Sequence, residues 1–134
     1  MKNYLKPEKP DHTFTISNQG LAHVGDAVYE LMVRTMLCTI GTVKAKNLHN
    51  RAISYVSAKA QAEAVDKIID MLDEDEKSIY KRGRNIHASS VPKGSSHEEY
   101  HAATGLETLF GHLYLSGDSD RLNELFTVII EERQ

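Results

Sequence analysis

Two acidic side chains, Asp26 and Glu107, are candidates for chemistry, because each lies in a segment whose other residues indicate a buried helix. In GDAVYE, Asp26 and Glu30 are four residues apart, which places both on one face of a helix. Gly25 has no side chain, so another backbone or a ligand can approach Asp26 closely. Glu107 lies inside a second apolar segment. A carboxylate in such surroundings is costly unless it is paired or bound to a metal.

Two carboxylates from crossing helices would suit phosphodiester hydrolysis. Mg²⁺ takes oxygen ligands, keeps several waters, and is often held by one or two carboxylates plus a substrate phosphate. Such an ion activates water and stabilises the charge on the leaving oxygen. The spacing also permits a purely structural explanation, in which Asp26 and Glu107 pair with Arg34, with Lys59 or with helix-end amides.

One short segment is basic, although the whole chain has a net charge of −3. Residues 77–96 contain five lysines and arginines and no acidic residue: Lys77, Lys81, Arg82, Arg84 and Lys93. Arginine grips phosphate through two parallel hydrogen bonds, so this segment is a candidate contact for a nucleic-acid backbone. Lys81 and Arg82 could instead only cap the end of a helix. Arg84 is expected beyond that end.

A second pattern, His97-Glu98-Glu99-Tyr100-His101, matches H-E-x-x-H, which can bind zinc on a helix and supply a general base. Here it falls in the first turns of a capped helix, where Glu98 and Glu99 already favour the helix dipole. The preceding residues, KGSS, lack the apolar character expected beside a buried zinc. A zinc peptidase therefore remains an alternative and not the preferred function.

Length and composition indicate one ordinary globular domain. The chain has 134 residues, of which 40% are hydrophobic and 26% charged, enough for one core without disulfides. Its single cysteine, Cys38, cannot form an internal disulfide. No apolar run approaches the ~18 residues of a membrane span, and the N-terminus does not resemble a signal peptide. We therefore expect a cytoplasmic protein with no membrane partner.

The spacing of apolar residues predicts an all-α fold with about five main helices. Apolar residues recur every three or four positions from residue 17 onward, and no segment alternates as a strand does. A flexible N-terminal arm, residues 1–16, is expected before a single domain, residues 17–134. Residues 86–96 have turn chemistry throughout and predict the longest internal loop.

Capping residues predict where these helices begin and end. Ser17 or Asn18 can cap the first helix, and Gly41 ends it. The second helix is expected to run unbroken from Thr42 to about Met71. The other three are expected from the acidic run at 73–76 to about 83, from a capping box at 96–99 to about 117, and after 118.

Four segments in order together resemble the ribonuclease III catalytic domain: GLAHVGDAVYE at 20–30, NLHNRAISYVSAKAQA at 47–62, YKRGRN at 80–85 and TGLETLFGHLYL at 104–115. The resemblance runs from about residue 17 to residue 130. It is closest to the family's short branch, Mini-ribonuclease III, which lacks the double-stranded-RNA-binding domain. It implies the helical ribonuclease III endonuclease fold and metal-dependent cleavage of double-stranded RNA.

By this resemblance, Asp26 and Glu107 match the family's acidic metal ligands for Mg²⁺, for which Mn²⁺ can substitute. Ordinary ribonuclease III has further acidic residues where this chain has Gln19, Ala22 and Thr104. The short branch shows similar non-acidic residues at 22 and 104. Positions 19 and 22 share a helix face with Asp26, and Thr104 lies one turn from Glu107. Gln19 and Thr104 could still hold a water or an RNA hydroxyl, so Gln19 joins the RNA-binding candidates.

The resemblance implies further that the end of the third helix and the loop after it contact the RNA duplex. The residues concerned are Lys81, Arg82, Arg84, Asn85 and Lys93. Duplex RNA is recognised mostly by its shape, phosphates and 2′-hydroxyls. Any sequence preference would therefore have to come from the loop.

A homodimer is also implied, because in the family the signature helices of two subunits pair and form two active sites. Each site would cut one strand and leave short 3′ overhangs. Leu21, Tyr29, Met32 and Met36 are candidates for the interface or equally for the core. The family's usual task is maturation of ribosomal RNA precursors, especially the large-subunit RNA. The alternative is a dimeric RNA-binding module without activity, because acids are missing at 22 and 104.

Overall fold

The structure, a computed structural model, describes residues 1–8, 16–87, 91, 93–94 and 96–131. In this part of the chain all regular structure is helical, as the sequence predicts. The helices are α1 (Asn18–Thr39), η2 (Ala45–Asn47), α2 (Leu48–Val56), α3 (Ala58–Ile68), η3 (Ile69–Met71), α4 (Glu74–Arg84), α5 (His97–Leu115) and α6 (Ser119–Glu131).

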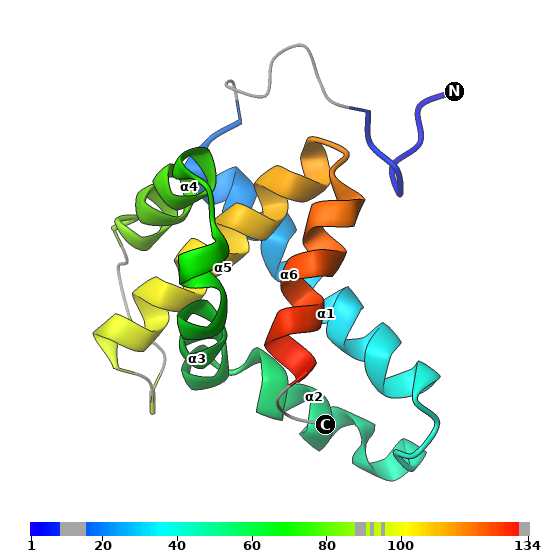
Figure 1. The fold of residues 1–134 in the computed structure, drawn as a ribbon. Helices are drawn as coiled ribbons and strands as arrows, with labels where there is room; N and C mark the ends of the chain where they lie inside the picture. Colours follow the sequence, from blue (N-terminus) through cyan, green and yellow to red (C-terminus); the bar gives the residue numbers. More distant parts are fainter. Residues whose placement is uncertain (9–15, 88–90, 92, 95, 132–134) are drawn as a thin grey trace.

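Helix α5 lies at the centre of the fold and contacts α1, α3, α4 and α6 (Figure 1). Its side chains Leu106, Leu109 and Phe110 are completely buried. The Phe110 ring lies 5.2 Å from the ring of Tyr29 in α1, which in turn meets the Phe126 ring of α6 edge-on at 5.9 Å. Such aromatic pairs add about 0.5–1.5 kcal/mol beyond the area that they bury. The core thus ties α1 and α6 to α5.

The helix ends follow the capping chemistry of the sequence. The Ser17 hydroxyl accepts a hydrogen bond from the Gly20 amide at 3.0 Å, which opens α1. Ser96 and Glu99 form the expected reciprocal capping box of α5. The Asp118 carboxylate accepts from the Arg121 amide at 3.1 Å and opens α6. These contacts satisfy backbone amides that have no partner within their own helices.

The expected second helix is wrong in two respects. It does not begin at Thr42, since α2 begins at Leu48 after the short helix η2. It is also divided at Ser57, whose backbone is extended (φ −60°, ψ 154°) and whose hydroxyl accepts from the Ala60 amide at 3.2 Å. A serine that caps a new helix competes with continuation of the old one. The break turns one long helix into α2 and α3.

Three of the four side chains considered for an interface belong to the core. Leu21, Tyr29 and Met36 are 6%, 1% and 8% exposed, so they are packed within this chain. Met32 is only partly buried against the same core. Its neighbour Leu31, in contrast, is 57% exposed.

The N-terminal residues 1–8 contain no helix. The Tyr114 hydroxyl of α5 donates a hydrogen bond to the Tyr4 carbonyl at 2.5 Å. Residues 9–15 lie outside the described residues, so the flexibility of the arm stays a prediction. Among the helices described, none has the length and apolar character that a membrane span requires.

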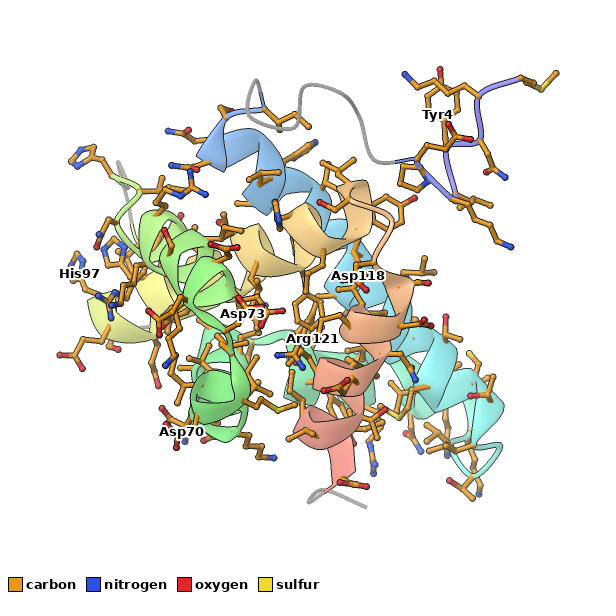
Figure 2. All side chains as sticks on the ribbon, turned by 45° about the horizontal axis from the view of Figure 1, so that its top comes forward. Tyr4, Asp70, Asp73, His97, Asp118 and Arg121 are labelled. Atoms are coloured by element: carbon orange, nitrogen blue, oxygen red, sulfur yellow. The ribbon has the colours of Figure 1, made fainter. Side chains whose placement is uncertain are left out.

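A buried ion pair fastens α6 to the start of α4. The Arg121 guanidinium donates to both oxygens of Glu76, each at 2.8 Å, and to the Met71 carbonyl at 2.7 Å. Figure 2 shows Arg121 reaching from α6 toward the turn that ends at Asp73. The Glu76 residue is 6% exposed. The hydrogen bonds from Arg121 hold the pKa of Glu76 below its ordinary value of 4.5, against the opposing effect of burial.

We predict that Glu76→Gln lowers the free energy of unfolding at pH 7 by roughly 2–4 kcal/mol, because Arg121 loses its buried anionic partner and keeps only an exposed one, Glu124. Because the folded-state pKa of Glu76 is depressed, the pair contributes fully above pH 4.5 and less as the pH falls through the folded-state value. Urea unfolding of both proteins between pH 3 and 7 measures this. Glu74→Gln, at an exposed position of the same helix, is the control. An equal difference at all pH values would contradict the prediction.

Candidate active site

The site is built where α1 and α5 cross at backbone contact. A Cβ atom added to Gly25 would lie 1.6 Å from the Glu107 carbonyl oxygen. A Cβ atom added to Gly111 would lie 1.9 Å from the Leu21 carbonyl oxygen. Neither distance is possible for a real side chain, so only glycine at both positions allows the helices to pack this closely. The crossing brings Asp26, next to Gly25, to Glu107.

The carboxyl groups of Asp26 and Glu107 lie close enough to share a hydrogen bond. Asp26 is exposed, whereas Glu107 is half-buried. Burial and, second, the charge of Asp26 raise the pKa of Glu107 from 4.5 to about 8. Two acids from distant parts of the sequence therefore meet at one point, as the sequence predicts, and one face of the pair is open to solvent.

The structural explanation for these acids is not supported. Arg34, one of the cations considered as their partner, pairs instead with Glu30 of its own helix, at 2.6 Å. Glu30 is thus occupied in an ion pair within α1. Within the described residues, no ion pair joins Asp26 or Glu107 to a lysine or arginine. No cation of the described residues therefore balances the charge of the pair.

Sequence reasoning missed a third member of the site, Gln61 of α3. Its side-chain nitrogen donates to the Glu107 carboxylate at 3.3 Å and to the Val56 carbonyl at 3.0 Å. Gln61 is 4% exposed. The available signal was its position, since Gln61 shares one face of α3 with the buried residues Ala64 and Ile68. A polar residue on a buried face needs a partner, and here that partner is the acidic pair.

The two positions considered as replacement ligands differ in their surroundings. Thr104 is 9% exposed, and its hydroxyl donates to the Tyr100 carbonyl of its own helix at 2.9 Å. Its proton is therefore already committed. Gln19 is exposed, on the α1 face of Ala22 and Asp26. Gln19 is free to meet a ligand from solvent.

Two carboxylates and a buried amide fit a divalent cation that prefers oxygen. Mg²⁺ is often bound by only one or two carboxylates, with water and substrate phosphate completing its shell. Among the described residues no cluster of three or more histidine, cysteine or acidic side chains is found. The Oε1 atom of Gln61 is buried without a hydrogen-bond partner in the described chain. Asp26 and Glu107 are the residues that would hold the ion, and the uncharged amide of Gln61 contacts Glu107 through its nitrogen.

The basic residues gather at the end of α4, but they do not form one continuous row. Lys81, Arg82 and Arg84 occupy its last turn and are exposed, and Asn85 is its C-cap. Arg84 is thus inside the helix and not beyond its end. Arg82 lines a cleft of about 580 Å³, whereas Arg84 and Asn85 line another of about 840 Å³. Lys93 is exposed in the loop that follows.

The H-E-x-x-H histidines lie in the cleft of Arg84 and not with the acidic pair. The His97 and His101 rings are stacked with centroids 6.4 Å apart, at the start of α5. Figure 2 shows His97 at the edge of the molecule. In the part of the chain that is described, no third acidic or histidine ligand completes a zinc site with them.

Comparison with known families identifies the fold. Residues 19–118 match the model of the Ribonuclease III domain, which covers α1 through α5 and both acids. The chain belongs to the ribonuclease III family. The resemblance seen in the sequence motifs is thereby confirmed, with Asp26 and Glu107 both inside the matched region.

Relatives of the short branch of the ribonuclease III family match nearly the whole chain. A Mini-ribonuclease 3 of Thermoanaerobacter sp. (strain X514) is 46% identical over 121 residues, which cover 88% of this chain and 85% of that protein. The Mini-ribonuclease 3 of Synechocystis sp. (strain PCC 6803) is 38% identical over 93% of this chain and 85% of its own length. A crystal structure of a Fusobacterium nucleatum protein, 30% identical, matches with a TM-score of 0.83 over 93% of this chain and all of its own.

We predict that Gly111→Ala lowers the free energy of unfolding by at least about 2 kcal/mol, because the new methyl group forces α1 and α5 apart. Thermal or urea unfolding measures the loss. Gly20→Ala is the control, since among the described residues its methyl would meet only the Ser17 and Ile16 side chains, at 3.2 and 3.3 Å. Its effect should stay within about 1 kcal/mol. Equal stability of the two variants would contradict the close crossing.

Proposed function

We propose that this chain is a metal-dependent endoribonuclease that hydrolyses phosphodiester bonds in double-stranded RNA. Membership of the ribonuclease III family and the name of its relatives, Mini-ribonuclease 3, support the reaction class. One observation of the structure carries the proposal: Asp26 and Glu107, 81 positions apart in sequence (107 − 26), meet where α1 and α5 cross. Two adjacent carboxylates without a cationic partner in the described chain are a suitable site for a divalent ion.

The proposed cofactor is Mg²⁺, for which Mn²⁺ can substitute, held by Asp26 and Glu107. When bound, such an ion activates water for attack on phosphorus and neutralises charge on the leaving oxygen. Because Asp26 is exposed, a phosphate of the duplex can approach the pair from solvent. Gln61 donates a hydrogen bond to the Glu107 carboxylate, which would hold this side chain in place while RNA is bound.

The basic residues at the end of α4 are proposed to hold the RNA backbone. Lys81, Arg82 and Arg84 project from one helix turn, and Asn85 and Lys93 follow in the connection to α5. Because Arg82 and Arg84 line different clefts, they would contact phosphates on different sides of the end of α4. Gln19, exposed on the same face of α1 as Asp26 and two turns before it, is proposed to contact RNA near the cleaved bond.

A homodimer is proposed as the working form, because a partly apolar groove on α1 lies open. The groove has a volume of about 750 Å³ and is lined from α1 by Val24, Ala27, Leu31 and Met32, and from α6 by Leu122. Leu31 is 57% exposed within it. A second copy of the chain seated there would cover this side chain. Two subunits would supply two sites, one for each strand of the duplex.

By its family, the proposed cellular substrate is a ribosomal RNA precursor, especially the large-subunit RNA, in the cytoplasm. This proposal rests on family membership alone. Cleavage by the purified protein of transcripts that span the ends of the large-subunit ribosomal RNA would test this proposal directly.

We predict that the purified protein cuts long duplex RNA, and neither single-stranded RNA nor duplex DNA, only with Mg²⁺ or Mn²⁺. Asp26→Asn and Glu107→Gln should each reduce the cleavage rate by at least about a hundred-fold. Loss of a residue that only supports a metal ligand already costs up to about a hundred-fold, and loss of a ligand itself should cost no less. Asp70→Asn, the same chemical change at an exposed position of η3, is the matched control.

The two variants should still bind duplex RNA, which a gel-shift titration measures. If the wild-type protein binds duplex RNA and never cuts it with either ion, the enzyme proposal is wrong. The non-catalytic RNA-binding module is then the better function, and Ala22 and Thr104 are its explanation.

We predict that replacing both Arg82 and Arg84 by alanine weakens RNA binding and makes it less sensitive to salt. Each lost phosphate contact reduces the slope of log K against log salt by about 0.9. Binding is measured in the Asp26→Asn background between 50 and 200 mM salt. Arg51→Ala, at an exposed position of α2, is the control. An unchanged slope with a lower melting temperature would show that the two arginines only cap α4.

A further inference from the structure

The side chain of Gln61 is held in one orientation by two acceptors. Its amide nitrogen donates to the carbonyl of Val56 at 3.0 Å and to Oε2 of Glu107 at 3.3 Å. An amide has two N–H donors, and both are used here. A reversed amide would point its oxygen at the Val56 carbonyl, which can only accept a hydrogen bond and would repel it. The neighbours therefore fix which end of the amide faces Glu107.

The chain break at Ser57 makes this contact possible. Because α2 stops at Val56, the carbonyl of Val56 is available to a side-chain donor. Ser57 caps α3, and the backbone N–H of Gln61 donates to the Ser57 carbonyl in the first turn of α3, with an N···O distance of 2.9 Å. Gln61 is thus anchored at the start of a helix and reaches across to α5.

The contact divides the two oxygens of the Glu107 carboxylate. Oε2 accepts the hydrogen bond from Gln61, while Oε1 is not engaged by that amide. A carboxylate held by one oxygen cannot rotate freely, so its other oxygen keeps one position. Side chains that hold a metal ligand in this way commonly determine how tightly the metal binds.

We propose that Gln61 is the positioning residue of the acidic pair: by fixing Oε2 of Glu107, it presents the other oxygen to a divalent cation shared with Asp26. The inference rests on the proposed function, since it assumes that the pair binds a cation. Gln61 does not touch the reacting atoms in this account, and it acts only through Glu107.

The test measures metal affinity separately from cleavage. Mn²⁺ is titrated into RNA-free protein by calorimetry, for the wild type, Gln61→Met and Gln61→Asn. Methionine has a similar shape and no amide, whereas asparagine keeps the amide and is one methylene too short to reach both acceptors. Glu76→Gln is the control, because it also removes a buried polar contact but lies in the separate ion pair with Arg121.

For Gln61→Met, we expect the Mn²⁺ dissociation constant to rise about 10–100-fold. The Mg²⁺ concentration for half-maximal cleavage should rise by a similar factor, and saturating Mg²⁺ should restore most of the rate. Glu76→Gln should melt at a lower temperature with wild-type Mn²⁺ affinity. If Gln61→Met does not fold, Gln61→Asn provides the same comparison.

Two failures are distinguishable. If the Gln61 variants fold and bind Mn²⁺ as the wild type does, with an unchanged Mg²⁺ requirement, the inference is wrong and Gln61 only joins α2, α3 and α5. If the wild type itself binds no Mn²⁺ and cuts no RNA, the proposed function has failed.

Discussion

The backbone contact between α1 and α5 is the constraint on which the fold and its site both depend. Gly25 and Gly111 remove the two side chains that would keep the helices apart, and each faces a carbonyl oxygen of the other helix. At this spacing Asp26 and Glu107 must be neighbours, because they adjoin the crossing. The same α5 also packs closely on α4, where Gly105 meets the ring of Tyr80. Helix α5 therefore forms the centre of the core, contributes one acid of the site, and packs against α4, whose end is basic.

The crossing has an energetic cost that the rest of the core must offset. It places a half-buried carboxyl beside a second one, and burial with the charge of Asp26 raises the pKa of Glu107. Removal of a carboxylate from water is unfavourable unless a partner compensates. Gln61 compensates part of the cost through one hydrogen bond. A divalent cation would compensate the remainder, so in this account the site is least stable in the state without metal.

Much of this structure could be predicted from local sequence signals, since those signals are themselves local physics. The caps at Ser17 and Ser96 could be predicted because each depends on a short segment. The two acids of α1 and α5 could be predicted as a pair because the ordered motifs resemble a known family. The break at Ser57 could not be read in the same way, because the apolar spacing continues through it and only the tertiary contacts select the capped form. Gln61 was missed for a related reason: its partner, Glu107, is 46 residues away (107 − 61).

The assignment of Asp26 and Glu107 as the metal ligands is tested most directly by anomalous X-ray diffraction from crystals grown with Mn²⁺. It predicts a single strong peak between α1 and α5, within bonding distance of carboxylate oxygens from both Asp26 and Glu107. Gln61 should remain hydrogen-bonded to Glu107 in the same map. Crystals that bind Mn²⁺ only elsewhere, at a concentration that supports cleavage, would contradict the assignment of these two acids as the metal site.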